Sequence, residues 1–189
     1  FQIGHYGDAK LSVDGRTMAD YFIGGILKRD LQLPKGASLF WDYLDDYDFV
    51  LTPLPNHLFQ RDNTAFAYEG LSVHPMAKPA RQRELVHSRA IWNFHPTFRD
   101  AGLHYYYGND DEHHQPATCE GGDILVIGNG AVMIGMGERT TPQGIGMLVR
   151  GYFSDPRNLV NKVIVVELPK TRAFMHLDTA MTMIDKDAF

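Results

Sequence analysis

The sequence predicts a mixed α+β domain built from one repeated unit, a β-hairpin followed by a helix and a further strand. Three aspartates, Asp62, Asp123 and Asp178, stand 61 and then 55 residues apart, and an apolar run follows each of them. After the first two, a turn, a second apolar run, a helical pattern and a third apolar run follow in the same order. Repeated supersecondary units of this kind are stacked linearly or arranged radially.

The N-terminal part of the chain lies outside this repeat. Residues 17–31 carry apolar side chains near helical spacing, which predicts an amphipathic helix, with the turn at 34–36 ending it. Residues 48–53 read DFVLTP and predict a short buried strand.

The first repeated unit begins after Asp62. The apolar runs 64–68 and 71–73, separated by a Glu-Gly turn, predict a hairpin. The segment 79–94 then predicts a helix, because Pro79 suits a first helical turn and apolar residues recur along one face. The apolar run 103–108 predicts the strand that completes this unit.

The second unit repeats this order, and a third begins. Residues 124–127 and 131–136 flank Asn129-Gly130, the strongest short hairpin signal; a helix begins at Pro142, and 162–168 predict a strand. A third hairpin is predicted to start with a strand at 179–184. A radial array needs at least about four units to close. The sequence therefore predicts about two units and part of a third of a larger array.

Composition narrows the possible partners. The 189 residues are 44% hydrophobic and 22% charged, enough for one core, and the net charge of −5 argues against nucleic acid. One cysteine cannot form an intramolecular disulfide, and no apolar stretch approaches the roughly 20 residues that span a bilayer. We expect a cytoplasmic protein with a small-molecule partner, no membrane association, and a homo-oligomer as one option.

Polar residues stand directly before each predicted hairpin. In a radial or pseudosymmetric assembly, equivalent positions of repeated units face the same axis. Asp62, Glu120 with Asp123, and His176 with Asp178 are therefore expected to converge. Several carboxylates near one imidazole suit a cationic substrate. In an extended segment His176 and Asp178 share one face, whereas Cys119 and Glu120 face opposite sides.

Each of these residues also has an ordinary structural interpretation. An aspartate before a hairpin is often a turn residue, a single histidine is often structural, and Gly121-Gly122 allows close backbone approach. Cys119 is most simply a small buried residue. Their recurrence at one place in three units favours a site. The cluster of Asp, Glu and His at 110–115 is interpreted as a solvated loop, and no metal is predicted.

The ordered motifs resemble those of the arginine deiminases, within the guanidine-modifying enzymes. They read LPNHLFQRD (54–62), CEGGD (119–123), GMGERT (135–140) and LPKTRAFMHLDT (168–179), with Pro79-Ala-Arg81 between them. The resemblance implies a partial five-bladed α/β-propeller over residues 41–189. Residues 1–40 then match the end of the helical insertion that these deiminases carry.

The same resemblance implies roles for single residues. It makes Asp62 and Asp178 the clamp for the substrate guanidinium, a contact that bidentate hydrogen bonding makes strong. Glu120 shares this contact and His176 moves protons. Three further residues match positions that hold the carboxylate end of arginine: Asn56, Arg81 and Arg139.

The implied reaction is hydrolysis of L-arginine to L-citrulline and ammonium through a covalent cysteine intermediate, without cofactor or metal. Cys119 does not match the family's nucleophile, which belongs to the last blade, so the nucleophile is expected outside these residues and the chain alone is expected to be inactive. Two alternatives stay open: a non-catalytic module that binds guanidines, and an amidinotransferase or methylarginine hydrolase.

Overall fold

The computed structural model describes residues 14–31, 33–34, 36, 38–108 and 116–189. The chain divides into two compact units, Phe1–His57 and Leu58–Phe189. The boundary predicted between residues 40 and 41 stays a prediction, as does the assignment of the N-terminal part to a helical insertion. The segment 110–115, predicted as a solvated loop, lies outside the described residues. No helix in the described part of the chain is long and apolar enough to cross a membrane.

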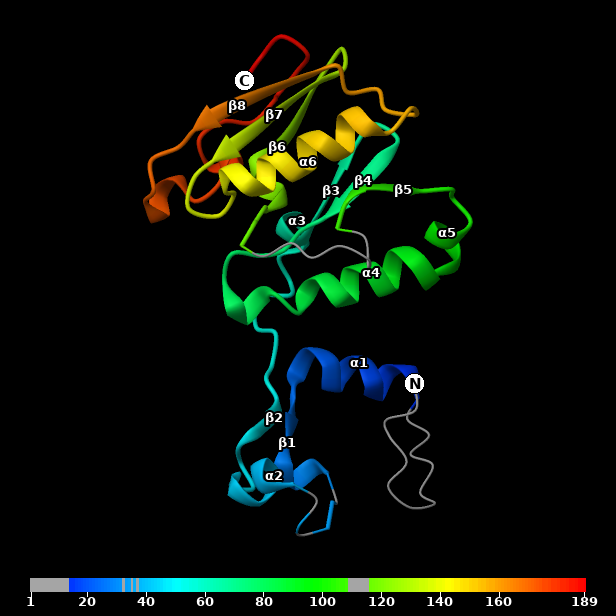
Figure 1. Ribbon diagram of the computed structural model, residues 1–189, viewed down its shortest axis with the longest axis vertical. Helices are drawn as coiled ribbons and strands as arrows, with labels where there is room; N and C mark the ends of the chain where they lie inside the picture. Colours follow the sequence, from blue (N-terminus) through cyan, green and yellow to red (C-terminus); the bar gives the residue numbers. More distant parts are fainter. Residues whose placement is uncertain (1–13, 32, 35, 37, 109–115) are drawn as a thin grey trace. The chain divides into compact units, whose positions relative to one another are not determined.

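The N-terminal unit contains a helix, a small antiparallel pair of strands and a short second helix (Figure 1). Helix α1 (Gly15–Gly24) is capped by Asp14, whose carboxylate accepts from two backbone N–H groups of the first turn. Strand β1 (Ile26–Leu27) pairs with β2 (Phe49–Leu51), and α2 (Leu39–Tyr43) lies between them in the chain.

The predicted helix over 17–31 is wrong in its second half. The helix ends at Gly24 because Gly25 has a φ of 85°, and an added Cβ there would lie 2.6 Å from the carbonyl oxygen of Leu51. Residues 26–27 pair with the strand predicted within 48–53, which is confirmed as β2. Its predicted burial is wrong, because no residue of Phe49–Leu51 is buried and Phe49 is 43% exposed.

The second unit contains the repeat that the sequence predicts. In the first half, β3 (Thr64–Ala67) and β4 (Gly70–Val73) form the hairpin, α4 (Glu84–Phe94) and α5 (Pro96–Arg99) follow, and β5 (His104–Tyr107) pairs parallel to β4. The helix expected at 79–94 begins with a 3₁₀ turn at Pro79–Arg81.

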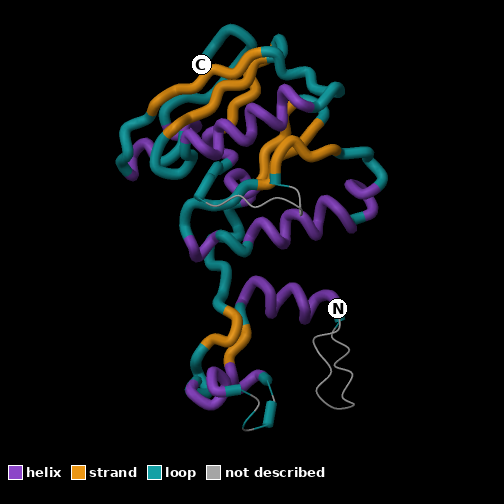
Figure 2. Tube along the Cα trace, in the orientation of Figure 1, coloured by secondary structure: helices purple, strands orange, loops and turns teal. Residues whose placement is uncertain are grey.

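The second half has the same topology. Strands β6 (Ile124–Gly128) and β7 (Ala131–Met136) form the hairpin, α6 (Pro142–Ser154) follows, and β8 (Lys162–Glu167) pairs parallel to β7 (Figure 2). Thr141 caps α6, with Pro142 at its first position as predicted. The strand order of the two sheets, β3-β4-β5 and β6-β7-β8, confirms the hairpin, helix and strand unit.

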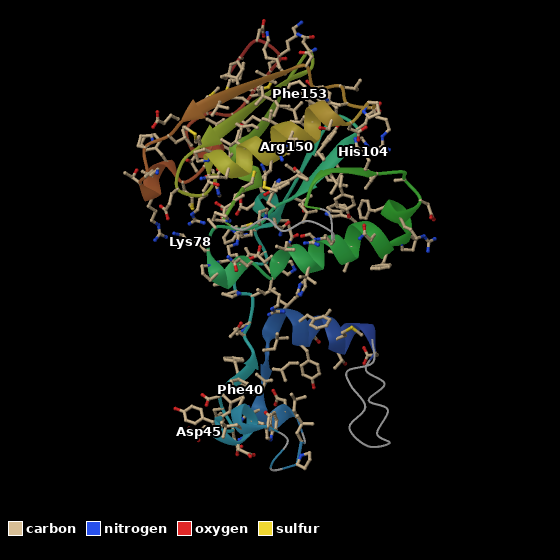
Figure 3. All side chains as sticks on the ribbon, viewed as in Figure 1. Phe40, Asp45, Lys78, His104, Arg150 and Phe153 are labelled. Carbon is tan, nitrogen blue, oxygen red and sulfur yellow. The ribbon has the colours of Figure 1, made fainter. Side chains whose placement is uncertain are left out.

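Helix α6 packs between the two sheets. Its backbone at Gly151 approaches the carbonyl of Tyr106 on β5 so closely that a Cβ would collide with it. Tyr152 is fully buried in the same core, whereas Phe153, labelled in Figure 3, is 55% exposed. The buried residues of this core are Ala65, Ala67, Tyr106, Tyr107, Cys119, Ile124, Val132, Ile134, Ile145, Leu148, Tyr152 and Val160.

The strand predicted at 179–184 is not formed. Residues Leu177–Thr179 make a 3₁₀ turn, in which the Thr179 hydroxyl and backbone N–H both donate to the carbonyl of His176. Further along, Asp185 and Ala188 form one isolated bridge. A strand is stable only when a neighbouring strand pairs with its backbone, and the local turn satisfies these groups instead.

Candidate active site

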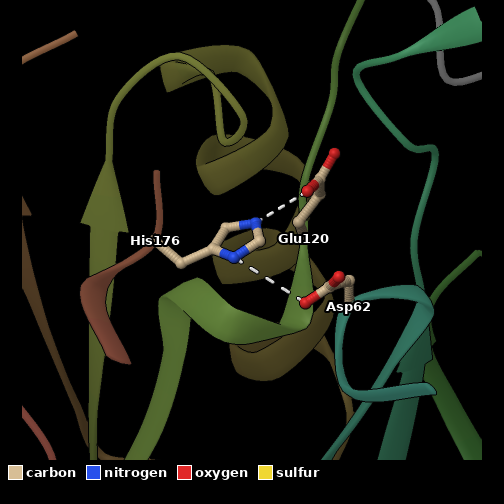
Figure 4. Close-up of side chains that lie close together, drawn as sticks. All are labelled: Asp62, Glu120 and His176. Atoms are coloured by element: carbon tan, nitrogen blue, oxygen red, sulfur yellow. Dashed lines mark hydrogen bonds and ion pairs between the residues drawn. The ribbon is translucent and has the colours of Figure 1, made fainter. Parts of the chain in front are cut away.

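The polar residues that precede the hairpins converge, as the repeat predicts. Figure 4 shows the imidazole of His176 between the carboxylates of Asp62 and Glu120. His176 Nε2 is hydrogen-bonded to Glu120 Oε2 at 2.7 Å, and His176 Nδ1 lies 3.7 Å from Asp62 Oδ1. Asp62 comes from α3 (Gln60–Asn63), whereas Glu120 and His176 each precede a 3₁₀ turn. Three segments far apart in sequence therefore form one site.

Glycines make room for this arrangement. A Cβ at Gly122 would lie 2.7 Å from the Cγ atom of His176, and a Cβ at Gly121 would collide with the carbonyl of Arg61. The two glycines after Glu120 therefore let the imidazole and α3 approach the backbone of this segment, as the close-approach interpretation of the sequence expects.

The site favours a charged pair of His176 and Glu120. Burial lowers the pKa of His176, but the hydrogen bond to Glu120 and the charges of Asp123, Asp62 and Glu120 together raise it above its ordinary value. Burial raises the pKa of Glu120, and the hydrogen bonds from His176 and the Ala77 N–H together with the Arg139 charge lower it further than burial raises it. An imidazolium can thus donate a proton to a leaving group in this site.

This pair is expected to make stability depend on pH in both directions. The His176 contribution is complete below the ordinary pKa of 6.5 and is lost as pH rises through the raised pKa. The Glu120 contribution is complete above 4.5 and is lost as pH falls through the lowered pKa. The urea midpoint of the full-length protein should therefore exceed that of Glu120→Gln most between about pH 4.5 and 6.5. A difference that is constant from pH 4 to 9 would contradict the charged pair.

Asp178 lies beside this cluster rather than on an extended strand with His176. The 3₁₀ turn removes the alternation that was expected to place both side chains on one face, so that expectation is wrong. Asp178 Oδ2 lies 3.6 Å from Arg61 Nε, and the Asp178 side chain is 28% exposed. Its contact with a substrate guanidinium stays a prediction. Asn56 belongs to the N-terminal unit, and its role also stays a prediction.

Arg81 is buried and bound on several sides. Its Nε and Nη2 donate to both carboxylate oxygens of Glu84, at 2.8 and 2.9 Å, and its Nη1 donates to Asp62 Oδ2 at 2.6 Å. Nη2 also donates to the carbonyl of Phe59. In this structure Arg81 therefore holds Asp62 in place, and its proposed contact with a substrate carboxylate stays a prediction.

Arg139 reaches the cluster from the other side. Its Nη1 donates to Glu120 Oε2 at 3.3 Å, and its side chain is 15% exposed. The neighbouring Glu138 forms an ion pair with Lys78, which is labelled in Figure 3. Acidic and basic side chains thus alternate in one chain of successive ion pairs. Its members, in order, are Glu84, Arg81, Asp62, His176, Glu120 and Arg139.

Sequence reasoning missed Glu84 and Thr140. Glu84 has no exposed surface and pairs with Arg81 three residues before it, a spacing that favours contact on a helix and was visible in the sequence. Thr140 is also fully buried, and its hydroxyl hydrogen-bonds Asp123. Nothing local in the sequence distinguishes Thr140 from the threonine that follows it.

The comparison with known families agrees with this geometry. The sequence model of the family described as arginine deiminase matches residues 10–189 of this chain. The chain belongs to the arginine deiminase family. The resemblance seen in its motifs is confirmed, and the match places the chain among the guanidine-modifying enzymes.

Solved structures that are similar to this chain include two hydrolases and an amidinotransferase. A dimethylarginine dimethylaminohydrolase adduct with S-methyl-L-thiocitrulline is 21% identical, with a TM-score of 0.47 over 67% of this chain and 45% of that one. The Pseudomonas aeruginosa enzyme of that kind, complexed with citrulline, is 21% identical, with a TM-score of 0.44 over 64% and 43%. SxtG, an amidinotransferase from Microseira wollei, is 16% identical, with a TM-score of 0.43 over 65% and 37%. The chain spans less than half the length of these structures.

The cluster of this deiminase-family chain also has the residue types of a metal site. Asp62, Glu120 and His176 are the one such group among the described residues, with ligand atoms within 4.8 Å of one another. However, the imidazole lies between the carboxylates, with one ring nitrogen toward each (Figure 4). In this arrangement Nε2 is engaged in the hydrogen bond to Glu120, and Nδ1 faces Asp62 at 3.7 Å.

Cys119 faces the core, as strand alternation predicts. It is fully buried among apolar residues, whereas Glu120 faces His176. Burial, with the charge of Asp123, raises the pKa of the Cys119 thiol well above its ordinary value. A thiol of this kind is a poor nucleophile at neutral pH.

Cys119→Ala is therefore expected to leave turnover by the full-length protein within about threefold of wild type, since it removes a small buried group that faces away from His176. Alkylation of the native protein followed by peptide mass mapping should leave Cys119 unmodified until denaturant is added. Rapid native labelling of Cys119, or loss of turnover without loss of folding, would show that its orientation has been misassigned.

Proposed function

We propose that this chain is part of an arginine deiminase that hydrolyses L-arginine to L-citrulline and ammonium. The observation that carries the proposal is the cluster of one imidazole and two carboxylates in a chain of this family. Carboxylates bind a planar guanidinium through paired hydrogen bonds, and an imidazole transfers protons near neutral pH.

The proposed reaction has two steps. A cysteine thiolate attacks the guanidinium carbon, the bond from that carbon to a terminal nitrogen breaks, and His176 gives its proton to the departing ammonia. Water then attacks the same carbon and gives one proton to the imidazole. The carbon–sulfur bond breaks, citrulline and the thiolate are released, and the second proton of the water passes to solvent, where it converts the ammonia to ammonium. In this proposal the thiolate comes from outside residues 1–189, because Cys119 is buried and faces the core.

The carboxylates hold the substrate in this proposal. Glu120, Asp62 and Asp178 bind the guanidinium, and its positive charge favours their ionised forms. Asp62 accepts a hydrogen bond from the guanidinium of Arg81, and this contact with a group of the same kind supports the proposal. Arg139 and Asn56 are proposed to contact the carboxylate end of the substrate.

We also propose that the repeated units continue into a five-bladed α/β-propeller. The support lies in a difference between two equivalent strands. On β5, Tyr106 and Tyr107 are buried where α6 of the next unit covers them, whereas on β8, Ile164 and Val165 are 38% and 46% exposed. A further unit that follows β8, in the way that α6 follows β5, would cover these side chains.

A product assay on the full-length protein tests this function. With L-arginine, it should release citrulline and ammonium in equal amounts. Release of an alkylamine from a methylated arginine, with little turnover of arginine, would support a methylarginine hydrolase. Ornithine formation that requires an amine acceptor would support an amidinotransferase, and arginine binding without product would support a binding module.

A further inference from the structure

A line of buried hydrogen bonds connects the backbone of Glu120 to the backbone next to His176. The backbone N–H of Glu120 donates to Thr140 Oγ1 at 3.1 Å, and the Thr140 hydroxyl donates to Asp123 Oδ2 at 2.5 Å. The other oxygen of Asp123 accepts from the backbone N–H of Leu177 at 2.8 Å. The four residues are at most 1% exposed, so no solvent competes for these hydrogen bonds.

This line joins the two segments that carry the reacting side chains. One end is the backbone of Glu120, and the other is the backbone next to His176, 56 residues away. We propose that Thr140 and Asp123 form a buried positioning pair that holds Glu120 and His176 in the relative position that proton transfer requires. Neither residue touches the substrate in this proposal, and its catalytic part rests on the proposed function.

The surrounding sequence leaves space for this link. A Cβ at Gly135, on β7, would collide with Asp123 Oδ1 and would lie 2.9 Å from the Cβ of Leu177. A Cβ at Gly122 would displace the ring of His176. The glycines on both sides therefore permit a direct contact between Asp123 and the segment of His176.

The pair does more than fill the core. Thr140 satisfies a buried backbone N–H of the residue that binds the imidazole, and Asp123 satisfies a buried N–H of the residue after the imidazole. If the link is broken, the two segments are joined less firmly, and a shift of about 1 Å in a catalytic group costs up to about 10²-fold in rate.

Thr140→Val in the full-length protein tests the pair, because it removes the hydroxyl with little change in volume and no change in charge. We expect kcat for arginine to fall about 10- to 100-fold with a smaller change in KM, and Thr140→Ser to restore most of the rate. Thr64→Val is the matched control, since Thr64 is also buried but hydrogen-bonds Asn63 and Trp92. This control should keep the wild-type rate.

The titration of His176 provides a readout that does not require turnover. Selective ¹⁵N-histidine labelling, with His176→Gln for assignment, should show a lower His176 pKa in Thr140→Val than in wild type, because the hydrogen bond to Glu120 weakens. Thr64→Val should show the wild-type value. If Thr140→Val does not fold, Thr140→Ala provides the same comparison.

An unchanged His176 pKa in the valine and alanine variants would overturn the positioning role, as would a serine variant as impaired as the valine variant. Absence of citrulline with the wild-type protein would refute the proposed function only. The His176 titration would then decide the positioning role alone.

Discussion

Replacing His176 with glutamine in the full-length protein is expected to lower arginine turnover by about 10²- to 10⁴-fold, the range that a general acid–base group contributes. His176 is the imidazole held between Glu120 and Asp62, and its raised pKa keeps it protonated for the departing ammonia. A glutamine side chain can keep one hydrogen bond but cannot transfer this proton. Citrulline formation at saturating arginine measures the effect.

His95→Gln is the matched control, because His95 is exposed and lies in the loop between α4 and α5. It should keep wild-type turnover, and circular dichroism should show that both variants are folded. Turnover by His176→Gln within tenfold of wild type would refute the proton-transfer role. A loss of turnover confined to low substrate concentration would indicate a binding role instead.

Replacing Arg81 with methionine is expected to destabilise the protein by about 3–5 kcal/mol, the range for removing one partner of a buried ion pair. Glu84 has no exposed surface and receives two hydrogen bonds from Arg81, so the substitution leaves a buried carboxylate without its cation. Urea denaturation of the full-length protein measures the change.

Two comparisons make this prediction specific. Arg81→Met combined with Glu84→Met should be less destabilising than Arg81→Met alone, because both charges are then absent. Arg99→Met removes an exposed ion pair with Asp100 and should leave the urea midpoint close to that of the wild-type protein. An Arg81→Met protein with wild-type stability and a raised KM for arginine would restore the substrate-binding role that the motif implies.

The elements predicted best from the sequence are those whose signals are local. Both hairpins, the strands that follow them and α6 were predicted because alternation, Asn-Gly and Pro142 act within a few residues. The predictions over 17–31 and 179–184 failed for one shared reason. Each depended on a neighbour that is distant in sequence. For the helix this neighbour is the carbonyl of Leu51 beside Gly25, and for the strand it is a pairing strand for the residues after Asp178.

The candidate site shows the same division. Recurrence of the polar residues predicted that Asp62, Glu120 and His176 meet, and alternation predicted that Cys119 points away. The spacing of Arg81 and Glu84 was a visible signal that they could pair. The sequence could not decide between this pair and a ligand contact, because an arginine in a motif looks the same whether it faces a ligand or a buried carboxylate.

The sequence by itself determined the repeated unit, the family and the residues that converge, since these depend on periodicity, turn chemistry and ordered motifs. The tertiary structure alone decided which groups pair. It placed His176 between two carboxylates, paired Arg81 with Glu84 and hydrogen-bonded Thr140 to Asp123. The physical reason is that burial makes an unpaired charge or polar group costly, so each partner is chosen by three-dimensional proximity rather than by local sequence.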